Sequence, residues 1–517
     1  MKHWLSKTSA LLTAVLLITT SAHTEERIAD QRVAIQLLNN VETITFQVAE
    51  PFQVSTADQT IDMAAGVYSF TPETVHPAQQ RFHLFAKTFQ LDEGVEEAAY
   101  QKSWEARGHT AESVVVGKQL KTDSGRILDA RVHWISIVQT PTEAEALAQQ
   151  KALNAAEQWT WVRQELTQTG SGTVHLRGTA GAQTLTLPIR ISATCPITVA
   201  NVDVGFWDTN KQRIAYNGDL EVTVTPEGKL ELLEHLTVEE YLQGVLPSEM
   251  PSAWPIEALK AQAVAARSEV LVNLSTKHTL ELFDFCSTEH CRAYRGLELC
   301  APETNDALHQ TQGEILVHDN RIAQALFSAN CGGWTENNDT VWFGPENGAL
   351  RGRPDLLSPL SSPFGRPGKI QRWLTHPPEA YCDGDSDSFR WTRTYSEGEL
   401  KALIEKEHRI GSIQRIELGE RGVSGRFKWI RIHNTKETVF IKKELPIRQA
   451  LGGLPSAMFD LTVSGSAPNR IFTIHGAGRG HGVGLCQHGA NGMAKRGHNH
   501  HEILQHYFSD ITIERIH

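Results

Sequence analysis

The chain has 517 residues and a formal net charge of −11 at pH 7, with 49 Lys and Arg against 60 Asp and Glu. This length is too great for one ordinary hydrophobic core, so we expect about two to four domains. The basic residues are scattered, which excludes the basic face of a nucleic-acid-binding protein. The cysteine count is seven, so at least one cysteine must be free, metal-bound or paired outside the chain.

Residues 1–22 have the features of a secretory signal peptide. Lys2 and Lys7 supply positive charge, residues 10–18 form a short apolar run, and small residues precede His23. The run is short for a membrane span, and an uncleaved N-terminal anchor is the alternative. We therefore expect an exported protein of the periplasm or cell envelope, where disulfides can form.

Several modules are predicted before the main domain. Residues 23–80 alternate apolar and polar positions and predict a small β-rich region. Residues 81–166 predict strands and helices in alternation, with a last helix from Thr142 to about Trp161. Their order resembles a SPOR-type fold, a ferredoxin-like module that in its family binds glycan strands lacking stem peptides; an unrelated α+β domain is the alternative. Residues 173–234 have hairpin signals, and we expect them to join the sheet of the next domain.

A pair of helices is predicted around Glu249. Thr237 and Glu240 have the spacing of a capping box, which starts the first helix, and Pro247 is expected to end it. A longer, buried helix is expected after Pro255, because apolar residues recur there at helical spacing. Glu249 would then lie in a short turn among apolar neighbours, whose burial could raise its pKa. An ordinary solvated glutamate is the alternative.

The segment after these helices concentrates metal-binding residue types. Cys286, His290 and Cys291 lie in one loop, and His278 is the nearest candidate for a fourth ligand. Zinc takes thiolate and imidazole ligands, usually four of them. We therefore expect a zinc site, with a disulfide that uses Cys286, Cys291 or Cys300 as the alternative.

Two glycine-containing segments follow. In SANCGGWTEN, residues 328–337, Gly332 and Gly333 permit backbone torsions and close approaches that other residues resist. Residues 476–497 are denser in glycine, but no window has the G-x-G-x-x-G spacing and too little chain remains for a βαβ unit. A dinucleotide-binding loop is therefore excluded. His481 lies in this second segment, and structural hydrogen bonding is the alternative to a role in binding.

Three of these segments resemble motifs of the SpoIID/LytB family, in the order that the family has them. They are YLQGVLPSEMPSAWPIEALKAQAVAARS from Tyr241, SANCGGWTEN from Ser328 and GRGHGVGLCQHGANGMAKRG from Gly478. The resemblance covers residues 236–517. It implies an α+β fold class, in which a SpoIID-like mixed α/β catalytic domain follows the SPOR-like module and the β-rich segments.

The resemblance also implies a function. It implies a lytic transglycosylase that cleaves peptidoglycan glycan strands, stripped of stem peptides, with Glu249 as general acid and base and with 1,6-anhydro ends as products. The residues implied to shape the groove or hold the sugar are Ser328, Gly332, Gly333, His481 and Gln487. The cysteine and histidine loop resembles the zinc site of some members. A non-catalytic LytB-type modifier that stimulates a cell-wall amidase is the alternative, and a metal-dependent wall hydrolase is a third option.

Cys331 and Cys486 stand where many members of the family carry serine. A disulfide between them is one reading of the sequence. A thiol nucleophile is another, although no group that would activate the thiol is visible in the sequence.

Overall fold

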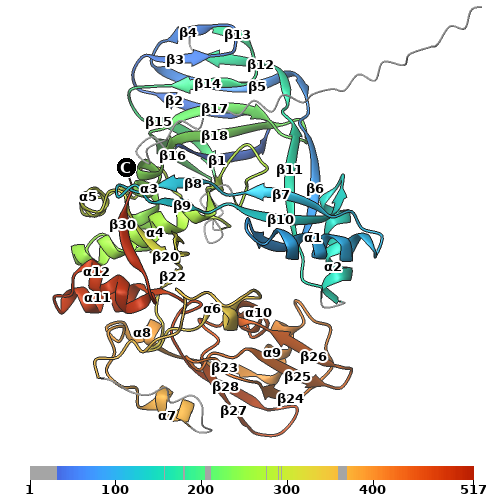
Figure 1. The fold of residues 1–517 in the computed structure, drawn as a ribbon, viewed down its shortest axis with the longest axis vertical. Helices are drawn as coiled ribbons and strands as arrows, with labels where there is room; N and C mark the ends of the chain where they lie inside the picture. Colours follow the sequence, from blue (N-terminus) through green and yellow to red (C-terminus); the bar gives the residue numbers. More distant parts are fainter. Residues whose placement is uncertain are drawn as a thin grey trace, which may run out of the picture.

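Helices and strands are mixed along the whole chain, which confirms the predicted α+β class. The computed structural model describes residues 32–516 apart from 156–157, 179–180, 204–210, 275, 289, 293 and 359–368, so the predicted signal peptide lies outside the described residues. Figure 1 shows a β sandwich at the top, a small α+β module beside it, a helical centre and a separate lobe below. Within the described residues, no helix has both the length and the apolar character needed to cross a membrane.

The two β-rich segments predicted on either side of the small module fold together into one sandwich. Strand β1 (Arg32–Val41) pairs antiparallel with β18 (Leu230–Thr237), and the sheets have the orders β19-β1-β18-β17-β14-β3-β4 and β13-β12-β5-β2-β15-β16. Alternate side chains of β2 point into the core, namely Ile44, Phe46 and Val48, whereas the central strand β18 is buried along most of its length. The other strands are β2 (Ile44–Val48), β3 (Phe52–Ser55), β4 (Thr60–Met63), β5 (Gly66–His76), β12 (Ser171–Gly178), β13 (Gly181–Thr186), β14 (Ile189–Ser192), β15 (Ile197–Val202), β16 (Gln212–Tyr216), β17 (Asp219–Val224) and β19 (Phe285–Cys286).

The small module is inserted between the two halves of the sandwich. Its elements are β6 (Gln79–Gln90), α1 (Gly94–Glu105), β7 (Glu112–Val116), the hairpin β8 (Gln119–Lys121) and β9 (Ile127–Asp129), β10 (Val132–Thr140), α2 (Glu143–Ala155) and β11 (Trp161–Gln168). The antiparallel sheet has the order β11-β6-β10-β7, which agrees with a ferredoxin-like arrangement. The helix predicted to reach Trp161 ends earlier, because Trp161 opens a strand and its ring packs against Phe85 and Trp134.

The helical centre is built around α4 (Ile256–Asn273), which is buried along most of its length. The elements packed on it are α3 (Val238–Glu249), α5 (Pro302–Gln310), α11 (Gln487–Lys495), α12 (His500–Tyr507) and β20 (Glu314–His318), and β20 pairs with β21 (Arg321–Ile322) and β30 (Thr512–Arg515). The guanidinium of Arg267, on α4, is fully buried and bonds both carboxylate oxygens of Glu239, at 2.7 and 2.9 Å. This pair locks α3 against α4.

The first of the paired helices does not end at Pro247, contrary to the prediction. Thr237 caps α3 through the predicted capping box, but the helix continues to Glu249. A proline inside a helix leaves the carbonyl four residues earlier without its N–H donor. That carbonyl, on Gln243, accepts a hydrogen bond from the Cys300 thiol at 3.3 Å instead. Glu249 is therefore the last residue of a helix and not part of a free turn.

The chain between the two glycine-containing segments forms the separate lobe (Figure 1). Its sheets, β23-β28-β27 and β24-β25-β26, enclose their own apolar core around Phe427 and Phe459. Its elements are α6 (Asn338–Val341), α7 (Lys369–Thr375), α8 (Ser386–Phe389), β23 (Arg390–Ser396), α9 (Glu397–Ile404), β24 (Ile413–Leu418), β25 (Trp429–Asn434), β26 (Thr438–Lys442), α10 (Glu444–Ala450), β27 (Phe459–Ser464) and β28 (Ile471–Ala477). The chain enters after β22 (Phe327–Ser328) and leaves at β29 (Leu485–Cys486), and these two strands pair in parallel. We call β22 and β29 the neck of the lobe.

Candidate functional site

Glu249 lies at the end of α3, beside the neck. Its side chain is 25% exposed, and its Oε1 accepts a hydrogen bond from Arg292 Nη1 at 3.2 Å. Arg292 also pairs with Glu269, and its guanidinium lies over the Phe327 ring, 4.6 Å from the ring centroid. The Gln487 amide donates to the backbone carbonyl of Glu249 at 3.1 Å. Glu249 is thus connected through Arg292 to Phe327 in β22, and it contacts Gln487, the residue that follows β29.

The surroundings of Glu249 favour its protonated form. Burial raises the pKa of Glu249, the positive charge of Arg292 opposes that rise, and the negative charge of Glu269 adds to it. Because Arg292 pairs with two carboxylates, its charge is shared between them. A partly exposed carboxyl with a raised pKa is what a general acid requires.

Two of the residues expected to hold a sugar are engaged with the backbone. Ser328 Oγ accepts a hydrogen bond from the Gly482 N–H at 3.1 Å. His481 Nε2–H donates to the Phe327 carbonyl at 2.9 Å, and its Nδ1 accepts from the Val483 N–H at 3.0 Å. Burial lowers the pKa of His481 to about 3, so this ring is neutral. Both side chains hold the second glycine-containing segment against β22, and direct contact with a sugar stays a prediction.

Gly332 and Gly333 support the neck through their backbone. Their φ angles are 77° and 99°, a region that side chains rarely permit. A Cβ on Gly332 would lie 3.0 Å from the Gly478 nitrogen, and one on Gly333 would lie 2.9 Å from the Trp373 ring. These glycines allow the two segments to pack closely, and their contact with a sugar stays a prediction.

The structure brings the four predicted zinc ligands together. The ligand atoms of His278, Cys286, His290 and Cys291, which we call the loop cluster, all lie within 4.8 Å of one another. His278 Nε2 is 3.2 Å from Cys291 Sγ, and His290 Nδ1 is 3.6 Å from Cys286 Sγ. Ligand atoms of a tetrahedral zinc site lie about 3.3 to 3.8 Å apart, given usual zinc–nitrogen and zinc–sulfur bond lengths. The residue types and their spacing therefore fit zinc.

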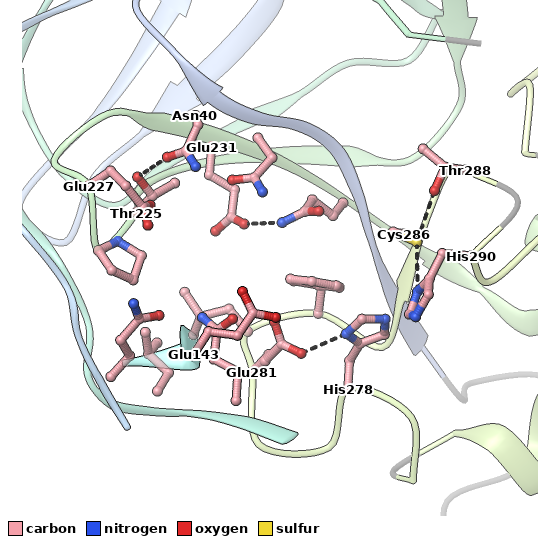
Figure 2. Close-up of a pocket in the computed structure, with 18 of the residues that line it drawn as sticks. Asn40, Glu143, Thr225, Glu227, Glu231, His278, Glu281, Cys286, Thr288 and His290 are labelled. Carbon is pink, nitrogen blue, oxygen red and sulfur yellow. Dashed lines mark hydrogen bonds and ion pairs between the residues drawn. The ribbon is translucent and has the colours of Figure 1, made fainter. Parts of the chain in front are cut away.

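The loop cluster is supported from outside and lies at the edge of a cavity. Glu281 Oε1 is 2.6 Å from His278 Nδ1, the kind of carboxylate contact that orients a metal-binding histidine. Figure 2 shows His278, Cys286 and His290 beside the cavity, which has a volume of about 1030 Å³ and is lined also by the sandwich and the small module. Glu249 is not among the residues that line this cavity.

None of the disulfides considered from the sequence is formed. All seven cysteines lie in the described part of the chain, and each is free. Cys331 and Cys486 are close, but the contact is a hydrogen bond from the Cys331 N–H to Cys486 Sγ at 3.1 Å. Burial raises the pKa of the Cys331 thiol, which disfavours the thiolate that a nucleophile needs.

Sequence reasoning missed the partner of Glu249. Arg292 directly follows the predicted ligand Cys291, in a segment to which no role had been given. Its position next to Cys291 could have indicated it, because a metal ion bound at Cys291 would also restrict the backbone of the following residue. Glu269, on the buried face of a helix, gave no such signal.

Comparisons with known proteins match the part of the chain that contains Glu249 and the loop cluster. A family model described as Stage II sporulation protein matches residues 226–318, and a second, described as a domain of unknown function, matches residues 338–484. An uncharacterized protein of Brachyspira hyodysenteriae is 30% identical over 287 residues, 54% of this chain and 68% of that protein. Stage II sporulation protein D of Bacillus subtilis is 28% identical over 304 residues, 54% of this chain and 75% of the relative. The amidase enhancer of Bacillus subtilis is 27% identical over 294 residues, 53% of this chain and 40% of the relative.

Proposed function

This chain belongs to the SpoIID/LytB family, and on that premise we propose that it is a peptidoglycan lytic transglycosylase with Glu249 as general acid and base. Family membership supports a function connected with the cell wall. The observation that carries the finer proposal is the Glu249 carboxyl, which is partly exposed, has a raised pKa and lies beside the neck. An exported protein would meet this substrate in the periplasm or cell envelope.

In the proposed reaction, protonated Glu249 gives its proton to the glycosidic oxygen while the bond from that oxygen to C1 breaks. The C6 hydroxyl of the same sugar forms the new bond to C1 and returns its proton to the Glu249 carboxylate. One product has a new hydroxyl and the other a 1,6-anhydro end, and no water is consumed. One carboxylic acid is sufficient here, whereas glycoside hydrolysis generally uses a pair.

Arg292 would stabilise Glu249 between the two proton transfers, when the carboxylate is charged. Its Nη1 is 3.2 Å from Glu249 Oε1, within reach of a charge-assisted hydrogen bond. Burial keeps the pKa of Glu249 raised despite Arg292, and the negative charge of Glu269, which shares the guanidinium, adds to the rise. The arrangement supports an acid that can also exist briefly as a base.

We also propose that the loop cluster holds a structural zinc ion. When bound, the ion would neutralise the two thiolates and tie the loop together, with no part in breaking the glycosidic bond. Its benefit would be to fix Arg292, which follows the last ligand. In a His290→Ala variant, we expect zinc content to fall and proteases to cut the loop faster. Unchanged zinc content would contradict this role of the loop cluster.

We propose that the substrate is a glycan strand without stem peptides. The strand order of the small module supports this proposal, because it fits the SPOR-type fold, whose family binds such strands. Binding of the full chain to intact wall sacculi and to sacculi stripped by an amidase tests it. We expect tighter binding to stripped sacculi. Equal binding to both would contradict this preference and leave the proposed cleavage reaction unaffected.

The central experiment digests purified peptidoglycan with the wild type and with Glu249→Gln, and detects 1,6-anhydro ends by mass spectrometry. We expect the variant to be slower by about 100-fold or more, because general acid catalysis contributes that much. Glu303→Gln, an exposed substitution in the first turn of α5, is the matched control and should keep wild-type activity. Equal products from wild type and Glu249→Gln would remove the assignment, and water-derived reducing ends would indicate a hydrolase.

The second candidate is a non-catalytic modifier that stimulates a cell-wall amidase, favoured by the similarity to an amidase enhancer. It predicts no anhydro ends from the wild type, together with faster release of stem peptides when an amidase is added. Glu249→Gln would then stimulate the amidase as well as the wild type does.

A further inference from the structure

A second group of potential metal ligands lies just inside the neck. The ligand atoms of Cys331, Asp355, Cys382 and Cys486, which we call the buried cluster, all lie within 4.8 Å of one another. Cys331 Sγ is 3.6 Å from Cys382 Sγ and 3.4 Å from Asp355 Oδ2. All four residues are fully buried. Four separate segments of the chain thus place three thiols and one carboxylate around one point.

We propose that the buried cluster binds one zinc ion through the thiolates of Cys331, Cys382 and Cys486 and the carboxylate of Asp355. Thiolates and carboxylates are established zinc ligands, and four of them complete a tetrahedral site. The two measured separations match the edges of such a tetrahedron, about 3.3 to 3.8 Å. An iron–sulfur cluster is disfavoured, because ligands this close to one another leave no space for several iron and sulfide ions.

The environment of Asp355 is consistent with a bound cation. Its Oδ1 accepts a hydrogen bond from Tyr507 Oη at 2.7 Å and lies 3.5 Å from His506 Nε2. Among the described residues, no lysine or arginine forms an ion pair with it. A fully buried carboxylate is unfavourable without a positive partner. A zinc ion would supply that partner.

The thiols have the contacts that metal-bound thiolates need. Cys486 Sγ accepts hydrogen bonds from the backbone N–H groups of Cys331, at 3.1 Å, and Gly489, at 3.4 Å. The fully buried guanidinium of Arg426 donates to the Cys331 carbonyl at 3.3 Å and brings positive charge near the cluster. Binding would displace three thiol protons, and these nearby donors and charges offset the remaining negative charge.

A disulfide explains the cluster less well than a metal does. Three thiols cannot all pair with one another, so any bridge within the cluster leaves one thiol unbridged and supplies no positive charge to the Asp355 carboxylate. A single zinc ion engages all four groups at once.

The proposed ion would fasten the base of the lobe. Cys331 follows the strand by which the chain enters the lobe, and Cys486 lies in the strand by which it leaves. Cys382 is held in turn by Asn330, whose side-chain amide donates to its carbonyl at 2.9 Å. The residue after Cys486 is Gln487, which contacts Glu249. The ion would therefore stabilise the neck whether or not Glu249 is catalytic.

The test measures the number of zinc ions per chain by elemental mass spectrometry. It uses the full-length mature protein without a histidine tag. We expect Cys382→Ser to lose one zinc ion per chain relative to the wild type. Cys195→Ser, which removes a free, partly buried cysteine outside both clusters, should lose none. X-ray absorption at the zinc edge of a Cys286→Ser/His290→Ala double variant isolates the buried cluster, and there we expect three sulfur ligands and one oxygen.

Three results would overturn the proposal. The first is a zinc content that Cys382→Ser does not change. The second is a zinc-edge spectrum of the double variant in which sulfur atoms are not the majority of the zinc ligands. The third is a wild-type protein in which peptide mapping without reductant finds a disulfide within the buried cluster. If Cys382→Ser does not fold, the double variant and the peptide map of the wild type still decide the question.

Discussion

Glu249, whose partner Arg292 follows the loop cluster, and Asp355, a member of the buried cluster, are two carboxylates with different surroundings. Glu249 is 25% exposed and has a cationic partner, Arg292, at 3.2 Å. Asp355 is fully buried, and its carboxylate contacts the phenol of Tyr507, the thiol of Cys331 and the imidazole of His506, with no lysine or arginine paired to it among the described residues. The comparison teaches that burial alone does not mark a catalytic acid. Partial exposure and a cationic partner distinguish Glu249, as the proposed acid requires, whereas Asp355 is completely enclosed, as the proposed structural metal site requires.

The largest expected difference between the two regions is in stability. We expect Asp355→Asn, which removes one ligand of the proposed buried zinc ion, to lower the free energy of unfolding of the zinc-bound protein by about 3 to 5 kcal/mol, the usual cost of removing one partner of a buried charged pair. Glu249→Gln should change it by only about 1 kcal/mol or less, because the site is partly exposed. Urea unfolding at pH 7 measures both. Similar losses for the two variants would contradict the distinction between the regions.

Glu249→Gln also has a predicted dependence on pH. Since the folded-state pKa of Glu249 is raised, the folded protein binds its proton more tightly than the unfolded chain does. Wild-type stability is therefore lowered, relative to the glutamine variant, as the pH rises through this raised pKa. Unfolding curves at several pH values check the sign, and a variant that is relatively more stable at low pH would contradict it.

The second difference is in metal release. His290 is exposed and Cys291 partly exposed, whereas every member of the buried cluster is enclosed. We expect a chelator to remove zinc from the loop cluster about tenfold faster or more, since release from the buried cluster requires a larger opening of the structure. An indicator dye follows the two phases. His290→Ala should remove the fast phase and Cys382→Ser the slow one, and a single phase in the wild type would contradict the difference.

The loop cluster could be predicted from the sequence because its ligands lie in one short segment. The buried cluster could not, since Asp355 and Cys382 lie in loops without a motif and only folding brings them to Cys331 and Cys486. Motif spacing reports local geometry, and a site assembled from four distant segments leaves no such pattern. The odd number of cysteines was the one indication in the sequence that not every thiol is paired in a disulfide within the chain.

For the fold, as for the two clusters, local features could be predicted from the sequence and long-range contacts could not. The capping box at Thr237 and the strand and helix order of the small module follow from local patterns, and the structure has them. The pairing of β1 with β18 does not, because the two strands lie on either side of an inserted module. The error at Pro247 has the same origin. Its compensating donor, Cys300, is distant in the sequence.

The third difference concerns Arg292, which has no counterpart beside Asp355. Because its positive charge opposes the rise in the pKa of Glu249, Arg292→Met should raise that pKa further. The proposed acid must be protonated, so the decline of activity at high pH should move to higher pH, by about one unit for a lost ion pair of this kind. The pH profile of anhydro-end formation measures the shift. Arg295→Met, which removes a neighbouring guanidinium 3.7 Å from Glu298, is the control and should leave the profile in place.

The smallest expected effect concerns Cys300, a thiol in neither cluster that supports the helix carrying Glu249. Cys300→Ala removes the donor to the Gln243 carbonyl and should cost about 1 kcal/mol of stability, the usual value of one hydrogen bond. In a Pro247→Ala background the helix supplies its own N–H to that carbonyl, so the same substitution should cost less. A double-mutant cycle by urea unfolding isolates this coupling. Equal costs in both backgrounds would show that the thiol does not replace the missing donor, and that α3 reaches Glu249 for another reason.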